Sequence, residues 1–150
     1  MIILALDLGK FNTMCCFFDT TTRTHSFLNA LTDRDYLTTV FKNHAVDLVV
    51  MEACGTAHYW GRRCQAHGHH VQLLPVQYVK PYVRRNKTDR MDTEALLEAA
   101  RCAGIQPLPV KTPEQQALQV GAAGAGPGPG PRADPCRQVQ PRRRRAWIGG

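Results

Sequence analysis

The 150-residue sequence has no apolar run near the 18 residues that a membrane-spanning helix needs. Its apolar start has no basic flank and does not resemble a secretory signal peptide. The six cysteines include no Cys-x-x-Cys pair, and serine occurs once, at position 26. These absences argue against a membrane protein and an exported disulfide-rich protein, so we expect reduced thiols in a cytoplasmic protein.

Positive charge is concentrated at the C-terminal end of the chain. Residues 1–119 hold 13 Lys/Arg against 11 Asp/Glu, whereas residues 120–150 hold six Arg against one Asp, and 12 of those 31 residues are Gly or Pro. Ordering about 30 residues would cost roughly 30–60 kcal/mol of backbone entropy. The four large apolar side chains there can return only about 6–12 kcal/mol. We therefore predict one folded domain over residues 1–119 and a disordered tail over 120–150.

The boundary between these two parts is abrupt. The helical pattern at 113–119 stops within an element, which indicates a frameshift or truncation after about residue 119. Other reading frames of the coding DNA should then continue a helical, Leu/Arg-rich pattern, and its absence from every frame would count against this interpretation.

Before residue 119, buried strands alternate with amphipathic helices. The predicted strands are 2–8, 14–18, 23–28, 46–51 and 71–74, and the predicted helices begin at 32–35, 56 and 88. Short connections make the first three strands antiparallel neighbours. The helix before the fourth strand makes that strand parallel to the first. The sequence therefore predicts an α/β fold with a mixed sheet.

Carboxylates stand where the buried strands end. Asp7 ends the first strand and Glu52 follows the fourth. As ends of neighbouring parallel strands, they should lie at one edge of the sheet, about 5 Å apart. Asp89 and Asp92 are three positions apart and share one face of a helix's first turn. The alternative role for these two aspartates is helix capping.

Four carboxylates in one site could not all stay ionised without a counter-charge. An all-oxygen ligand set selects Mg²⁺ or Mn²⁺, and two such ions about 3.5–4 Å apart clamp the reacting oxygens of a phosphodiester exchange. The order of elements and acids indicates an RNase H-like fold. Zinc is disfavoured, because the spacing of Cys64 and the histidines at 67, 69 and 70 fits no paired-ligand pattern.

A basic and aromatic segment precedes the acidic helix. Tyr78 and Tyr82 are four positions apart and offer stacking surfaces. Cationic side chains for phosphate contact follow the first strand and crowd this segment, at Lys10, Lys80, Arg84, Arg85, Lys87 and Arg90. The functional interpretation is nucleic-acid binding, and the alternative is a solvated basic linker.

Three segments, 6–9, 51–55 and 78–92, resemble the N-terminal RuvC-like domain of DEDD transposases, the bacterial insertion-sequence recombinases guided by a bridge RNA. The resemblance covers about residues 1–119, and the block 79–92 is its most specific part. It implies a catalytic and metal-binding set of Asp7, Glu52, Asp89 and Asp92, with Mg²⁺ or Mn²⁺, DNA and a guide RNA as partners, and a homo-oligomer for intact members. Thr93 stands where the family usually has alanine.

Intact members of that family continue through a helical linker into a domain that carries a serine nucleophile. Ser26 lies in a predicted early strand and does not match that role. The resemblance therefore implies an incomplete recombinase that retains metal and nucleic-acid binding. The alternatives are a Holliday-junction resolvase-like nuclease, an inactive transposase remnant, and an actin-like sugar kinase or ATPase. The last is considered because residues 7–13 resemble the first phosphate-binding loop of that class.

Overall fold

The computed structural model describes residues 1–83 and 88–123. Its strands form one mixed sheet in the order β3-β2-β1-β4-β5. They are β1 (Ile2–Leu8), β2 (Asn12–Asp19), β3 (Thr24–Leu31), β4 (Leu48–Glu52) and β5 (His70–Leu74). Strands β1 to β3 are antiparallel neighbours, and β4 pairs parallel with both β1 and β5. The predicted α/β class and mixed sheet are confirmed.

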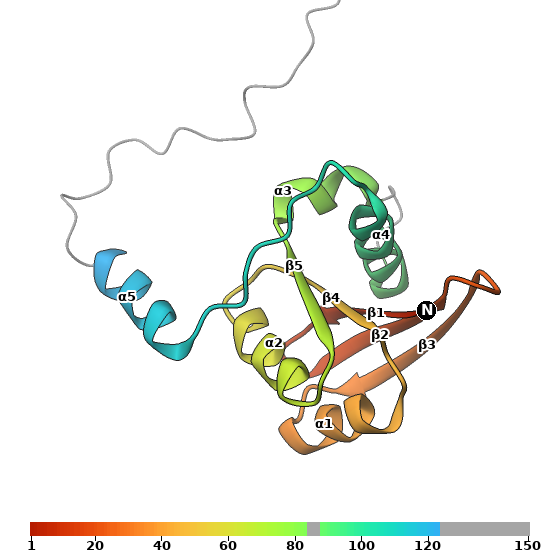
Figure 1. Ribbon diagram of the computed structural model, residues 1–150, viewed down its shortest axis with the longest axis horizontal. Coiled ribbons are helices and arrows are strands. Elements are labelled where there is room, and N and C mark those ends of the chain that lie inside the picture. Colours follow the sequence, from red (N-terminus) through yellow and green to blue (C-terminus); the bar gives the residue numbers. More distant parts are fainter. Residues whose placement is uncertain (84–87, 124–150) are drawn as a thin grey trace, which may run out of the picture.

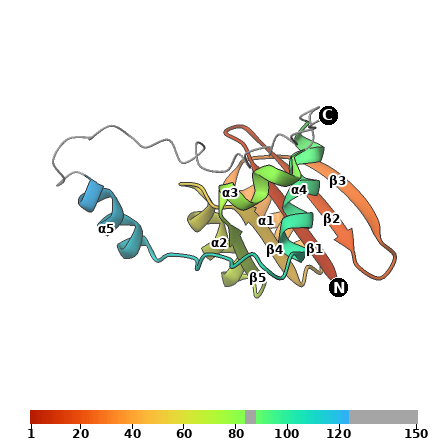
Figure 2. The same cartoon turned by 90° about the horizontal axis from the view of Figure 1, so that it is seen from above.

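Helices cover both faces of this sheet (Figure 1). One face carries α1 (Arg34–Asn43) and α2 (Ala57–Ala66), and the other carries α4 (Asp89–Arg101). Figure 2 shows α4 beside β1 and β2, which it contacts. The remaining helical segments are α3 (Val76–Val79), the 3₁₀ turn η1 (Lys80–Tyr82) and α5 (Pro113–Ala123).

The pleat of the central strand divides the core into two layers. Leu4 and Leu6 of β1 pack toward α1 and α2, where Phe41 and Trp60 meet them. Ile3 and Ala5 point to the opposite face, toward the buried leucines of α4. Because successive side chains of a strand alternate between faces, odd positions of β1 belong to the α4 side. This parity fixes the direction of Asp7.

A capping side chain begins α1, and a glycine in the left-handed conformation ends α2. Asp33 caps α1, since its carboxylate accepts hydrogen bonds from the Asp35 and Tyr36 amides at 3.0 and 2.9 Å. Gly68 ends α2 with a φ of +85°, and its amide donates to the Gln65 carbonyl at 2.9 Å. Glycine adopts this left-handed conformation without strain, which explains the stop.

The structure differs from the sequence predictions in several places. Strands β2 and β3 are longer than expected, because each pairs along its whole length with its neighbour. Strand β4 begins at Leu48, two residues later than predicted. Helical spacing also predicts that Tyr36 joins Leu37, Val40 and Phe41 in the apolar stripe of α1, but Tyr36 is 44% exposed. Helix α5 runs to Ala123, past the predicted boundary at 119, since the alanines at its end favour helix. Residues 124–150 of the predicted tail, with Arg84, Arg85 and Lys87, lie outside the described residues.

Among the helices of the described ranges, none combines the length and apolar character needed to cross a bilayer.

Candidate metal centre

Both strand-end acids face the α4 side of the sheet. In the β1–β4 register Leu6 lies opposite Met51, so Asp7 and Glu52 occupy the next position of two parallel neighbours. Val50 of β4 packs in the α4-side core, and Glu52, two positions later, shares its face. The strand pairing therefore places both acids at one edge of the sheet, as the sequence predicts.

The other two acids lie in the first turn of α4. Thr88 is the N-cap residue of this helix, and its hydroxyl accepts a hydrogen bond from the Met91 amide at 3.3 Å. The alternative in which Asp89 is the N-cap is therefore wrong, because Thr88 occupies that position. Asp89 and Asp92 follow within the first turn, where the positive end of the helix dipole favours carboxylates.

Three of the four predicted acids converge. Asp7, Asp89 and Asp92 each offer a carboxylate oxygen, and these three oxygens lie within 4.8 Å of one another. Asp7 and Asp92 are half-buried, whereas Asp89 is exposed. A divalent cation bound among them would interact favourably with all three carboxylates.

The donor set and its spacing fit a hard divalent ion. Ligands at 2.0–2.1 Å on opposite sides of Mg²⁺ are about 4.2 Å apart, and Mn²⁺ has the same preference for carboxylate and water oxygens. Oxygens within 4.8 Å of one another need only a small closure to reach that geometry. Asp7, Asp89 and Asp92 are therefore suited to hold Mg²⁺ or Mn²⁺.

Glu52 lies on the wall of the same cavity. The cavity has a volume of about 520 Å³, and Asp7, Glu52, Asp92 and Lys80 supply its polar lining. Its apolar wall consists of Val76, Val79, Val83 and Leu96. Glu52 is not among the acids whose oxygens lie within 4.8 Å. The structure thus brings three acids into direct range of one ion and puts the fourth beside them.

The apolar wall is the part of the site that sequence reasoning missed. Val76 and Val79 are the first and last residues of α3, and Val83 directly follows η1. The segment was interpreted above only for its charges and tyrosines. The spacing of three and four residues is typical of one helix face. This signal could have indicated that the segment packs over the acids as well as contacting a ligand.

Three of the predicted cationic residues, Lys10, Lys80 and Arg90, lie in the described ranges. Lys80 lines the acidic cavity. Lys10 follows β1, and its ammonium lies 5.2 Å from the centre of the Phe11 ring. Arg90 packs its guanidinium over Phe27 of β3, 5.1 Å from the ring centre. Tyr78 and Tyr82 are 45% and 38% exposed, so both rings remain accessible for stacking.

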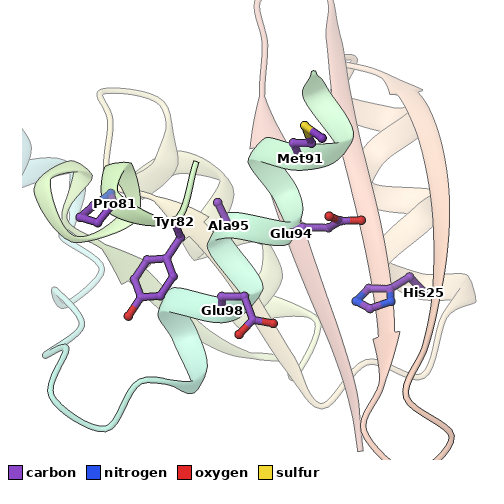
Figure 3. Close-up of a pocket in the computed structure, with 7 residues that line it drawn as sticks. All are labelled: His25, Pro81, Tyr82, Met91, Glu94, Ala95 and Glu98. Carbon is purple, nitrogen blue, oxygen red and sulfur yellow. The ribbon is translucent and has the colours of Figure 1, made fainter. Parts of the chain in front are cut away.

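A second cavity of about 530 Å³ lies along α4. Figure 3 shows Glu94 and Glu98 projecting from α4, with Tyr82 on one side of the helix and His25 on the other. Its lining residues are His25, Pro81, Tyr82, Met91, Glu94, Ala95 and Glu98. None of the four predicted site acids lines it, so it is separate from the candidate metal centre.

The disfavoured zinc interpretation has a structural explanation. The two ring nitrogens of His69 lie 2.9 Å from the carbonyl oxygens of Val46 and Phe41. Cys64 is fully buried in the core between the sheet and α2. His69 therefore contacts the end of α1 and the loop before β4, while Cys64 packs in the core, so both have structural surroundings. In the described part of the chain, the aspartate group is the one cluster of His, Cys, Asp or Glu that could hold an ion.

No protein-family model matches the chain. Comparison with curated proteins finds relatives that are named as transposases. Over 72 residues, 48% of this chain and 21% of the relative, the sequence is 53% identical to a probable family 20 transposase of Pseudomonas aeruginosa. Over 117 residues, 78% of this chain and 32% of the relative, it is 38% identical to the transposase for insertion sequence element IS1111A of Coxiella burnetii. This chain is related to insertion-sequence transposases.

The transposase for insertion sequence element IS1328 of Yersinia enterocolitica is 38% identical over 71 residues, which are 47% of this chain and 21% of that relative. The chain thus spans about a fifth to a third of the length of these transposases. The relationship supports the predicted similarity to insertion-sequence transposases. It favours the transposase class over the resolvase-like and sugar-kinase alternatives.

Proposed function

We propose that this chain provides the metal- and nucleic-acid-binding part of an insertion-sequence transposase, built on an RNase H-like fold. The observation that carries the proposal is the convergence of Asp7, Asp89 and Asp92, three acids from distant parts of the sequence, within 4.8 Å. The sheet supports the fold assignment, because three antiparallel strands are followed by two parallel ones and the central strand β1 ends in Asp7.

The acids would hold Mg²⁺ or Mn²⁺, with Asp7, Asp89 and Asp92 as direct ligands and Glu52 completing the DEDD set from the cavity wall. Bound divalent ions supply activation of an attacking oxygen and stabilisation of the leaving oxygen in a phosphodiester exchange. The chain's own contribution is to fix the acids on rigid elements. The valines of α3 and Leu96 limit solvent access from the side of the core.

Positive charge around the cavity would bind the phosphate backbone of DNA and of a guide RNA. The proposed contacts are Lys10, Lys80, Arg84, Arg85, Lys87 and Arg90. Lys80 has the most direct support, because it lines the cavity with the acids. Binding of this kind weakens steeply with added salt, since each phosphate contact releases counterions. Assembly as a homo-oligomer belongs to this proposal through the family resemblance.

The proposed activity of the described residues is binding rather than complete strand transfer. Ser26 pairs with Phe17 in the sheet and lines a cavity with Ile2, at the edge where β1 begins. Asp7 lies at the opposite end of that strand. A serine nucleophile for a reaction at the acidic centre therefore does not come from Ser26.

Isothermal titration calorimetry of the full chain with Mn²⁺ tests the proposal. We expect saturable binding that is lost in Asp7→Asn and in Asp92→Asn. Glu98→Gln is the matched control, because Glu98 is an exposed acid on the same helix. Unchanged Mn²⁺ binding in both aspartate variants would refute the shared site.

A further inference from the structure

Phe11 is exposed at the turn between β1 and β2. The ring belongs to the hairpin that carries Asp7, and 72% of the residue is accessible to solvent. Burial of a phenylalanine side chain is ordinarily favourable, so a ligand that covers this ring would gain that free energy.

The backbone around Phe11 is held firmly. A Cβ on Gly9 would collide with the Asn12 carbonyl oxygen, so the turn closes tightly at that glycine. The Thr32 amide donates a hydrogen bond of 2.8 Å to the Phe11 carbonyl. Below the turn, the buried hydroxyl of Thr13 is 2.8 Å from that of Thr32. The ring is therefore presented from a fixed position.

That position is at the same end of β1 as Asp7, which lines the acidic cavity. Phe11 follows Asp7 by four residues, and four residues of extended chain span at most about 14 Å. The ammonium of Lys10 lies 5.2 Å from the centre of the Phe11 ring, and Lys80 lines the cavity itself. This end of β1 thus combines the acids of the cavity, the cations Lys10 and Lys80, and an exposed aromatic face.

We propose that Phe11 stacks on an unpaired nucleobase of the strand whose phosphate lies at the acidic cavity, with Lys10 contacting a neighbouring phosphate. This inference rests on the proposed function and adds a binding residue that charge alone does not identify. An aromatic face beside a cation suits single-stranded nucleic acid, because every base offers a π face and every nucleotide a phosphate.

The competing occupant is a second copy of this chain. Leu31 is 57% exposed and lies opposite Asn12 in the β2–β3 register, so an apolar contact between copies could use both side chains. The position of Lys10 over the ring favours nucleic acid, since pairing two copies through this turn would bring like charges together.

The test uses the full chain and a single-stranded DNA oligonucleotide that contains 2-aminopurine, with Mn²⁺ present. Phe11→Ala should weaken binding about 5- to 150-fold, the range that stacking on one base supports, and should abolish quenching of the fluorescent base. Phe11→Trp should restore both. Leu118→Ala, at a residue of α5 with similar exposure, should bind as the unaltered chain does.

Each other outcome has a definite meaning. Unchanged affinity and quenching in Phe11→Ala, alongside binding by the unaltered chain, would overturn the stacking inference and leave the proposed function standing. A change from dimer to monomer in Phe11→Ala, seen by analytical ultracentrifugation, would also overturn it. An unaltered chain that binds neither Mn²⁺ nor the oligonucleotide would overturn the proposed function and this inference together.

Discussion

Asp7 at the end of the central strand and Asp92 in the first turn of α4 bring carboxylate oxygens within 4.8 Å of each other. The alternation of side chains along β1 directs Asp7 toward α4. The N-cap Thr88 sets the start of α4 and so the position of Asp92 in its first turn. A divalent cation bound by both carboxylates would stabilise the folded protein by linkage.

This linkage gives the first prediction. Mn²⁺ at about 100 times its Kd should stabilise the unaltered chain by about 2.7 kcal/mol, and Asp92→Asn should lose most of that gain, because it removes one of the three converging carboxylates. Differential scanning calorimetry with Mn²⁺ and with EDTA measures the gain in each protein. A full Mn²⁺ response in Asp92→Asn would contradict the prediction.

Glu52 should matter less than the three aspartates for the first ion. It lines the cavity but lies outside the group of oxygens within 4.8 Å, so its contact with a first ion requires a larger movement or an intervening water. We expect Glu52→Gln to weaken Mn²⁺ affinity by a smaller factor than Asp92→Asn in the same titration. Equal losses would show that all four acids coordinate together.

The cap of α4 links stability to the site. The Thr88 hydroxyl accepts the Met91 amide, and loss of such a cap typically costs about 0.5–2 kcal/mol. Thr88→Ala should lower the free energy of unfolding by that amount and also weaken Mn²⁺ binding, because both helix acids follow the cap. Thr88→Ser should retain both properties. Urea unfolding and Mn²⁺ titration of the two variants check this.

Much of this arrangement can be predicted from sequence, for reasons visible in particular residues. The apolar run of β1 and its terminal Asp7 indicate a buried strand that ends at a site. The helix before β4 indicates that β4, which ends in Glu52, pairs parallel with β1. The N-cap of α4 is harder to identify, since Thr88 and Asp89 are both good caps and only backbone geometry separates them.

Distances between elements are beyond such reasoning. The sequence predicts that all four acids share one site, yet the group of oxygens within 4.8 Å of one another holds Asp7, Asp89 and Asp92 without Glu52. The positions of side-chain oxygens on separate elements do not follow from spacing along the chain. The end of α5 is a similar case, because helix propensity continues through residues where the composition has already changed.

Cysteine reactivity should follow burial. Burial raises the pKa of Cys15 and of Cys64 to about 12 and that of Cys16 to about 11. At Cys102, which is exposed, a hydrogen bond from the Gly104 amide lowers the thiol pKa. Iodoacetamide at pH 7.5 should therefore modify Cys102 readily and leave the three buried thiols intact.

Mass spectrometry of peptides from the native protein, with urea-unfolded protein as the control, measures this order. In urea the difference between Cys102 and the buried cysteines should disappear. Rapid labelling of Cys15 or Cys64 in the native protein would contradict the buried packing of β2 against α2.

His58 should make the attachment of the segment before α5 depend on pH. Its Nδ1 accepts a hydrogen bond of 3.1 Å from the Lys111 amide, which requires the neutral ring. Burial, with the charges of Lys111 and Arg62, lowers the pKa of His58 below its ordinary 6.5. The unfolded chain therefore binds a proton more readily, and stability present above pH 6.5 is lost as pH falls toward the folded-state pKa.

The Tm of the unaltered chain should accordingly fall further between pH 7.5 and pH 5.0 than that of His58→Asn, whose amide oxygen can accept the Lys111 amide at either pH. Carboxylates titrate equally in both proteins, so the difference between them isolates the histidine. An NMR titration of the ring should give a pKa below 6.5. A pKa above that value would reverse the sign, because the protonated ring would then stabilise the fold and Nδ1 could not be accepting from Lys111.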